Sequence, residues 1–401
     1  MVQHVYIIGS KGLGNYGGYE TFVDKLTEYH QDEKNIKYHI ACKANGIGAM
    51  DEKKLDDAET LGGHYFSYHN AICYKINVPE KLGSAQAIFY DCKSFEWVLH
   101  DIKKNHIEHP IVYILACRIG PFVGRYVKEL HRLGGKCYVN PDGHEWMRAK
   151  WSRPVRWYWK KSEEGMVKHA DILICDSKNI EKYIKGEYKK YNPITTYIAY
   201  GADIKPSECD DKAFEAWLKS KGLRPYTYYM CCGRFVPENN FATMIREFMK
   251  SKTEKDFAII TTENEALLRE LDQKLGFRKD KRIKFVGTVY DQKLLKKIRE
   301  NAYGYFHGHE VGGTNPSLLE ALGSTKLNLL LDVGFNREVG ADAALYWNKS
   351  NGNLARLINQ ADKMKASDIE KLGQRARRRI SDAFSWQYIA DQYKNLWEMD
   401  R

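Results

Sequence analysis

The stretch that decides the fold is Val5-Tyr-Ile-Ile-Gly9-Ser-Lys-Gly12-Leu-Gly14-Asn-Tyr-Gly17-Gly18-Tyr-Glu20-Thr-Phe. A short apolar run leads into glycines and then into a helical pattern, which predicts a buried strand over residues 5–8 and a helix over residues 20–30. Glycine lets a backbone approach a ligand closely, and the N–H groups that open a helix attract phosphate. The stretch predicts a phosphate-binding loop, or a tight turn without a ligand.

Outward from this stretch, short apolar runs alternate with helical patterns to the end of the chain. This alternation is typical of parallel sheets with crossover helices, so we expect an α/β protein with two doubly wound, Rossmann-like domains. The predicted domains are residues 1–205, residues 206–380 and a closing helix over residues 381–399 (segment 381–401), which packs on the second domain or returns to the first. Predicted strands are residues 5–8, 38–42, 111–115, 136–140, 172–175, 228–232, 257–261, 283–286, 304–307 and 327–331; predicted helices include 20–30, 122–132, 241–250, 292–301 and 318–322.

The composition supports a globular protein with an anionic partner. The 401 residues are 43% hydrophobic, and 63 Lys+Arg against 52 Asp+Glu give a net charge of +11. This excludes a natively unfolded chain and favours a phosphate ester, a nucleic acid or an anionic membrane surface as partner. Nine cysteines without a C-x-x-C pair indicate reduced thiols in the cytoplasm, and no run reaches the ~18 apolar residues of a membrane span.

The second predicted domain contains two further loops of this kind. Cys232-Gly-Arg234 follows one strand, and an arginine fork at the mouth of a parallel sheet suits phosphate oxygens, although single arginines more often pair with a surface carboxylate. His307-Gly-His309-Glu-Val-Gly312-Gly313-Thr314-Asn315-Pro-Ser317-Leu-Leu-Glu320 follows another strand. We expect Ser317 to cap the next helix and Glu320 to lie in its first turn, where the carboxylate either accepts two ribose hydroxyls or only stabilises the helix.

The first predicted domain has polar side chains after the strand at residues 136–140. Asp142 and His144 follow it, at a place suited to proton transfer or to orienting a hydroxyl group. The alternative for Asp142 is an Asx-turn with Gly143.

A basic, tryptophan-rich stretch follows directly and has no acidic residue among residues 148–161. Indole rings with cations suit a lipid headgroup layer or a lipid-linked pyrophosphate, but also stacked nucleic-acid bases, or tryptophans in a core with a solvated basic face. The candidate membrane or acceptor residues are Arg148, Lys150, Trp151, Arg153, Arg156 and Trp157.

Two other site types are weaker. The spacing of Gly9, Gly12 and Gly14 fits a dinucleotide, but the second strand ends at Lys43 instead of an acidic residue for the ribose, which leaves an NADP-dependent oxidoreductase as an alternative. The chain has no Asp-x-Asp pair for Mg²⁺, and His307 and His309, predicted to share one face of a strand end, have no evident third metal ligand. We expect no metal and no cofactor.

Four motifs together resemble a known family: the bacterial β-1,4-rhamnosyltransferase group of capsule and cell-wall polysaccharide synthesis, within glycosyltransferase family 4 and the GT-B fold. The resemblance runs from Ile7 to about Tyr393. The motifs are Gly17-Gly-Tyr-Glu-Thr-Phe22, Asn140-Pro-Asp-Gly-His-Glu-Trp146, Gly233-Arg-Phe-Val-Pro-Glu-Asn-Asn240 and Gly312-Gly-Thr-Asn-Pro-Ser-Leu-Leu-Glu-Ala321, with Ala87-Ile-Phe-Tyr-Asp91 also similar.

The resemblance implies two domains facing a cleft, with a nucleotide sugar held mainly by the second and the acceptor by the first. Many relatives of the wider fold carry a lysine where Asn239 stands and a glutamate where Gly312 stands, so Glu320 is the better-supported glutamate and Glu310 the weaker one. The implied roles are: Asp142 and His144 orient the acceptor hydroxyl; Arg234 and, across the cleft, Gly17 and Gly18 meet the diphosphate; Gly313, Thr314 and Asn315 meet the sugar and phosphates; Glu320 meets the ribose; and Asn239 lies at the donor.

The implied function is metal-independent, retaining transfer of a sugar, L-rhamnose from dTDP-β-L-rhamnose foremost, onto a lipid-pyrophosphate-linked saccharide at the cytoplasmic face of the membrane. A UDP-hexose donor is the alternative within the fold. Outside it, the alternatives are the NADP-dependent oxidoreductase and a nucleic-acid-binding protein, although two glycine-rich switch points are not expected in the latter, and nucleic acid is not an expected partner.

Overall fold

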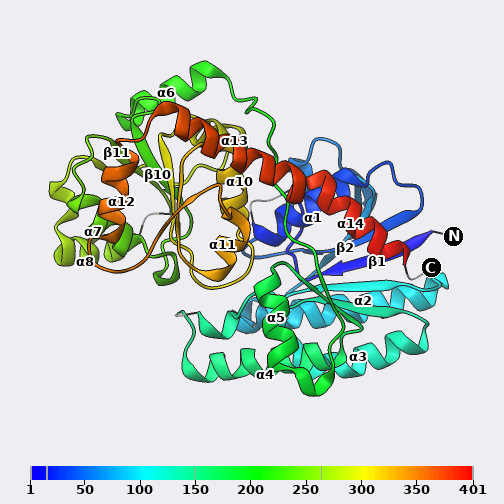
Figure 1. Ribbon diagram of the computed structural model, residues 1–401. Helices are drawn as coiled ribbons and strands as arrows, with labels where there is room; N and C mark the ends of the chain where they lie inside the picture. Colours follow the sequence, from blue (N-terminus) through cyan, green and yellow to red (C-terminus); the bar gives the residue numbers. More distant parts are fainter. Residues whose placement is uncertain (1, 15–16, 149, 263, 400–401) are drawn as a thin grey trace. The chain divides into compact units, whose positions relative to one another are not determined.

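The computed structural model describes residues 2–14, 17–148, 150–262 and 264–399, and divides the chain into two α/β units (Figure 1). Unit 1 comprises Met1–Tyr200 and Trp386–Arg401, and unit 2 comprises Gly201–Ser385. The sequence-based boundaries were drawn at residues 205 and 380. Asn15 and Tyr16 of the glycine-rich stretch lie outside the described residues.

Unit 1 is built on a nine-stranded sheet of order β3-β4-β5-β2-β1-β6-β7-β8-β9. All neighbours are parallel except that β4 runs antiparallel to β3 and β5. The order reverses between β1 and β6, which makes the carboxyl ends of these two strands the switch point, where α/β proteins bind ligands. The strands are β1 (Gln3–Ile8), β2 (Ile36–Lys43), β3 (Glu59–Gly62), β4 (Tyr65–Tyr68), β5 (Ala71–Ile76), β6 (Ile111–Leu115), β7 (Lys136–Asn140), β8 (Ile172–Cys175) and β9 (Thr195–Tyr197).

Helices cover both faces of this sheet because its central strands are buried on both sides. On one face, Ile8, Ile114 and Val139 share a core with apolar side chains of four helices. These are α2 (Gln86–Asn105), α3 (Gly120–Arg132), α4 (Arg153–His169) and α5 (Lys178–Glu187). On the other face, Phe22 of α1 (Gly18–Tyr29) packs against Tyr113 of β6.

The last helix, α14 (Trp386–Glu398), belongs to unit 1 and lies beside α1 (Figure 1). Its Tyr393 hydroxyl lies 3.0 Å from the Tyr113 hydroxyl, and Trp397 Nε1 donates to Tyr38 Oη at 2.9 Å. The closing helix expected over residues 381–399 is thus present and belongs to the first unit, one of the two predicted alternatives. Its expected start was wrong, because residues 381–383 end the preceding helix and α14 begins at Trp386.

Unit 2 is built on a six-stranded, wholly parallel sheet of order β12-β11-β10-β13-β14-β15. Here β10 and β13 are neighbours although two strands lie between them in sequence, so their carboxyl ends form the second switch point. The strands are β10 (Tyr228–Cys232), β11 (Asp256–Ile260), β12 (Ile283–Phe285), β13 (Gly304–His307), β14 (Asn328–Leu331) and β15 (Leu345–Trp347).

Two cores, one on each face of this sheet, hold the helices of unit 2. Both units are thus doubly wound, and the predicted α/β fold class is confirmed. The helices are α6 (Asp211–Lys221), α7 (Phe241–Lys250), α8 (Glu265–Leu275), α9 (Gln292–Glu300), α10 (Pro316–Ser324), α11 (Gly334–Gly340), α12 (Asn353–Ala361) and α13 (Ala366–Ala383). Short 3-10 helices in the two units span Glu52–Lys54, Glu80–Ala85, Glu145–Met147, Lys189–Tyr191, Pro237–Asn239 and Phe277–Lys279.

Candidate active site

In unit 2, the two loops at the switch point are joined by hydrogen bonds. Asn240 Nδ2 donates to Gly308 O at 2.8 Å, and the Glu310 amide donates to Glu238 O at 3.0 Å. A Cβ at Gly308 would lie 2.4 Å from Asn239 O, so only glycine permits this approach. The loops after β10 and β13 therefore form one rigid surface at the carboxyl edge of the sheet.

Arg234 and Asn239 have different environments on this surface. The Arg234 side chain is exposed, whereas its carbonyl accepts from the Val236 amide at 2.9 Å and from Asn239 Nδ2 at 2.7 Å. Asn239 Oδ1 lies 2.7 Å from His309 Nδ1, so the amide ties both loops together. Arg234 is thus a cation presented to solvent on a fixed backbone, and Asn239 holds that backbone.

The N-terminus of α10 corrects two expectations. Asn315, not Ser317, caps the helix: Asn315 Oδ1 accepts from the Ser317 amide at 2.9 Å. Pro316 occupies the first helical position, so Glu320 lies in the second turn and not the first. The predicted donor residues Gly313 and Thr314 are buried just before the cap, and Glu320 is partly exposed and paired with Arg299.

The two histidines of this segment do not lie on one strand. His307 ends β13 and is 4% exposed, and burial lowers its pKa well below the usual value. His309 lies beyond the strand end, bonded to Asn239. Among the described residues, no group of three or more His, Cys, Asp or Glu side chains is placed to hold a metal ion. Metal independence stays a prediction.

In unit 1, the glycine-rich loop packs closely around the end of β1. Gly9 has φ +105°, and a Cβ there would lie 2.3 Å from Leu115 O. Gly17 caps α1, and Glu20 in the first turn folds back so that its Oε1 accepts from the Lys11 amide at 2.9 Å. A Cβ at Gly17 would lie 2.1 Å from Glu20 Oε2. A carboxylate of the chain therefore lies beside the N-terminus where we predicted a diphosphate near Gly17 and Gly18, and that contact stays a prediction.

The loop after β7 has an unusual backbone. Asp142 and His144 have φ of +57° and +50°, values that few non-glycine residues adopt and that are enriched at functional sites. The side chain that bonds the backbone two residues on is Asn140 and not Asp142, the alternative raised for Asp142, because Asn140 Oδ1 accepts from the Asp142 amide at 2.8 Å. The turn is closed by the Asn140 side chain, so it does not require the carboxylate of Asp142.

A partly buried arginine beside this loop was not predicted from the sequence. Arg118 Nη1 donates to Gly9 O at 2.9 Å, Leu115 O at 3.1 Å and Asp91 Oδ2 at 3.1 Å. It joins the ends of β1 and β6 to α2, and it lies close enough to Asp142 for their charges to interact. Its partner Asp91 ends the motif at residues 87–91 that resembles the family, but the only sequence feature that could have pointed to Arg118 is its position shortly after the strand at residues 111–115.

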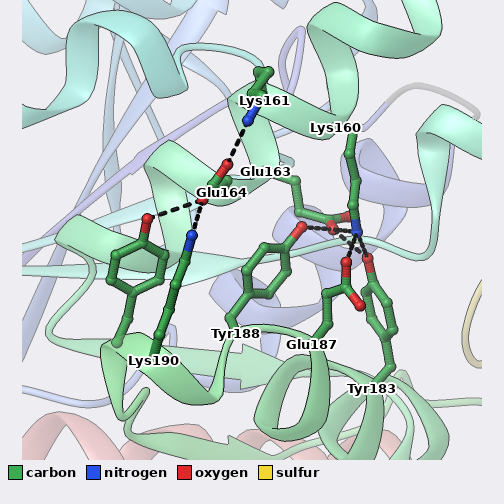
Figure 2. Close-up of polar contacts among 9 residues, drawn as sticks. Lys160, Lys161, Glu163, Glu164, Tyr183, Glu187, Tyr188 and Lys190 are labelled. Carbon is green, nitrogen blue, oxygen red and sulfur yellow. Dashed lines mark hydrogen bonds and ion pairs between the residues drawn. The ribbon is translucent and has the colours of Figure 1, made fainter.

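A polar network joins α4 and α5 (Figure 2), and His144 packs against its Tyr183. The His144 ring centroid is 4.1 Å from that of Tyr183, and burial, with the nearby Lys160 charge, lowers the pKa of His144. Lys160 Nζ lies 2.6 Å from the Tyr183 hydroxyl and 4.7 Å from the centre of the Trp146 ring. The network therefore supports the loop that carries Asp142 and His144.

The basic stretch is divided between paired and exposed side chains. Glu145 pairs with Arg148, lies 3.0 Å from Lys150 Nζ and accepts from Trp151 Nε1 at 2.9 Å. Glu145 therefore pairs with both cations of the first half and offsets one of their two positive charges. On α4, Arg153 is exposed, Arg156 is half-buried and Trp157 is 67% exposed. Among the described residues, we find no helix both long and apolar enough to span a membrane.

Comparison with solved structures shows which proteins share this fold. Sucrose-phosphate synthase from Thermosynechococcus elongatus superposes with a TM-score of 0.76 at 16% identity, covering 99% of this chain and 98% of its own. Anabaena HepE in complex with UDP-glucose gives 0.70 at 12% identity, with 100% of both chains covered. The E. coli trehalose-6-phosphate protein bound to UDP-2-fluoro glucose gives 0.72 at 10% identity and 99% of both chains. The chain thus has the two-domain GT-B fold of these proteins.

Sequence comparison adds a family. No curated protein sequence matches the chain. A family model described as a domain of unknown function (DUF1972) matches residues 2–203, which is half of the chain and most of unit 1. The chain therefore belongs to the DUF1972 family.

Proposed function

We propose that this protein is a retaining glycosyltransferase that transfers L-rhamnose from dTDP-β-L-rhamnose onto a lipid-pyrophosphate-linked saccharide. The observation that carries the proposal is the switch point of unit 2, where two hydrogen-bonded loops carry an exposed Arg234 after β10 and the N-terminus of α10, with Glu320 in its second turn, after β13. A cation and a helix N-terminus are what a nucleoside diphosphate leaving group requires. HepE, which shares the fold, binds UDP and glucose.

In this proposal, unit 2 holds the donor. Arg234 offers a planar fork to the diphosphate oxygens, and the amides of Gly313, Thr314 and Asn315 surround the phosphates and the sugar. Glu320 accepts hydroxyls of the nucleoside sugar; dTDP offers the 3′-hydroxyl alone, whereas UDP offers two. Asn239 acts through the backbone of Arg234, which its amide holds. Charge on the departing diphosphate is neutralised by Arg234 and the helix without a metal ion.

Unit 1 receives the acceptor. Asp142 and His144 orient the attacking hydroxyl, and a phosphate oxygen of the donor accepts its proton. Because burial lowers its pKa, His144 is neutral at pH 7 and acts as a hydrogen-bonding group. Lys43, which an NADP reading would place on a ribose phosphate, donates instead to Ile47 O and Gln86 Oε1, both at 3.1 Å. That geometry disfavours the oxidoreductase.

Donor identity is tested by thermal unfolding of the full chain with dTDP-rhamnose, UDP-glucose and NADPH in parallel. A ligand at 100 times its Kd raises the free energy of unfolding by about 2.7 kcal/mol, so the true donor raises Tm measurably. We expect dTDP-rhamnose to stabilise most, and transfer to a lipid-pyrophosphate saccharide to continue in EDTA. Stabilisation by UDP-glucose alone selects the hexose donor; stabilisation by neither sugar nucleotide rejects the proposal.

We also propose that α4 binds the cytoplasmic face of the membrane where the lipid-linked acceptor lies. Trp157 and Arg153 are exposed on this helix, and an exposed indole next to cations suits a headgroup layer, each cation contributing about 1 kcal/mol. We expect cosedimentation with vesicles containing anionic lipid, weakened by Trp157→Ala and by salt. Tyr290→Ala, which removes an exposed aromatic ring elsewhere, is the control. The placement is contradicted if Trp157→Ala binds vesicles as well as the wild type does, or if Tyr290→Ala weakens binding as much as Trp157→Ala does.

A further inference from the structure

Arg299, in the last turn of α9, is a buried cation in unit 2. It is 3% exposed. A buried charge is costly unless it is paired, so its partner indicates why it is there. Arg299 Nη2 lies 2.6 Å from Oε2 of Glu320 on α10.

The pair is asymmetric. The Arg299 side chain is 3% exposed, whereas that of Glu320 is 33% exposed. The arginine thus approaches the carboxylate from inside the fold, and the carboxylate faces outward at the switch point. Exposed ion pairs contribute little to stability, and buried pairs are weak evidence for it, so a stability role alone does not account for this pair.

The same guanidinium is tied to the ends of both switch-point strands. Arg299 Nη2 donates to Ser317 Oγ at 3.3 Å, and Ser317 Oγ lies 3.0 Å from the Tyr305 hydroxyl of β13 and 3.4 Å from Cys232 O, the last residue of β10. Thr325 Oγ1, just after α10, donates to Arg299 O at 2.9 Å. Arg299 therefore sets Glu320 relative to the loop that begins at Gly233.

We propose that Arg299 is a positioning residue of the donor site: it fixes the Glu320 carboxylate in the orientation that accepts a hydroxyl of the nucleoside sugar. This inference rests on the proposed function. Arg299 is too deep to touch the ligand and acts through Oε2 of Glu320. A carboxylate held in one rotamer loses less conformational entropy on binding and recognises the hydroxyl more strongly.

The test pairs protein variants with ligand variants. Calorimetry first shows which of UDP and dTDP binds more tightly. The Kd of that nucleotide is then compared with the Kd of its own 3′-deoxy form. In the wild type, we expect loss of the hydroxyl to weaken binding about 10-fold or more, as for hydrogen bonds to a charged group. We call the Kd of the 3′-deoxy form divided by the Kd of the nucleotide the hydroxyl ratio. In Arg299→Met this ratio falls below about 3-fold, and Glu320→Gln lowers it to the same extent. Arg299→Lys restores it in part.

A matched control separates positioning from general damage. Arg282 Nη2 also lies 2.6 Å from a carboxylate, that of Asp280, but before the edge strand β12 and away from the switch point. Arg282→Met should keep the wild-type ratio. The inference is overturned if folded Arg299→Met keeps the wild-type ratio. If the methionine variant does not fold, a wild-type ratio in both Arg299→Lys and Glu320→Gln overturns it. It is also overturned if the wild type binds the nucleotide and its 3′-deoxy form equally well. Failure of the wild type to bind either nucleotide rejects the proposed function itself.

Discussion

Replacing Arg234 with alanine should lower kcat for sugar transfer by about 10²–10³-fold, the effect of removing one well-placed charge-stabilising group. The diphosphate gains charge as the glycosidic bond breaks, and Arg234 is an exposed cation in the loop after β10 at the unit 2 switch point. Arg234→Lys should lose less than alanine because it keeps the charge, although it lacks the planar fork. Steady-state kinetics with the identified donor measure both variants.

Arg234→Ala should leave the protein stable, because the side chain is exposed and the contacts with Asn239 and Val236 are made by the Arg234 carbonyl, which alanine keeps. Its free energy of unfolding should stay within about 0.5 kcal/mol of wild type. The matched control is Arg269→Ala on α8, where the side chain is 71% exposed and pairs with Glu265. Full activity in Arg234→Ala, or an equal loss in Arg269→Ala, would contradict the assigned role.

Much of the fold could be predicted because buried parallel strands have a simple signature. The strands β1, β6, β10 and β14 are buried along nearly their whole length, so each contains an uninterrupted apolar run of at least three residues. The hairpin of β3 and β4 has no such signal: every residue of β3 is exposed, β3 pairs with β4, and β4 joins the hairpin to the sheet by pairing with β5. Such an edge is specified by neighbouring strands and not by its own sequence.

The candidate site divides in the same way. Loops rich in glycine after strands were predictable, since glycine marks close backbone approaches such as that of Gly308 to Asn239. The partly buried Arg118 and the buried Arg299 were not, because nothing local distinguishes them from the many exposed arginines. Their carboxylate partners lie 27 and 21 residues away in sequence. Tertiary structure alone brings these charges together.

The second large effect concerns stability and the network in Figure 2. Glu163 on α4 is 4% exposed and accepts from the hydroxyls of Tyr183, at 2.5 Å, and Tyr188. Glu163→Leu should lower the free energy of unfolding of unit 1 by about 3–5 kcal/mol, because both hydroxyls and Lys160 lose a buried partner. Glu163→Gln keeps an oxygen acceptor and should cost only about 1 kcal/mol. Hydrogen exchange of the α4 and α5 amides measures both.

The next residue provides a control of opposite sign. Burial raises the pKa of Glu163, so its contribution to stability is present below the unfolded pKa of 4.5 and is lost as pH rises through the higher folded value. Hydrogen bonds from Lys190 and Lys161 lower the pKa of Glu164 to about 2, so its contribution is present above pH 4.5 and is lost as pH falls toward 2. In Glu163→Gln, the free energy of unfolding should therefore fall less as the pH rises toward neutral. In Glu164→Gln, it should fall less as the pH is lowered toward 2. If both substitutions changed stability on the same side of the pH profile, the buried Glu163 and the more exposed Glu164 would not have the opposite electrostatic environments described here.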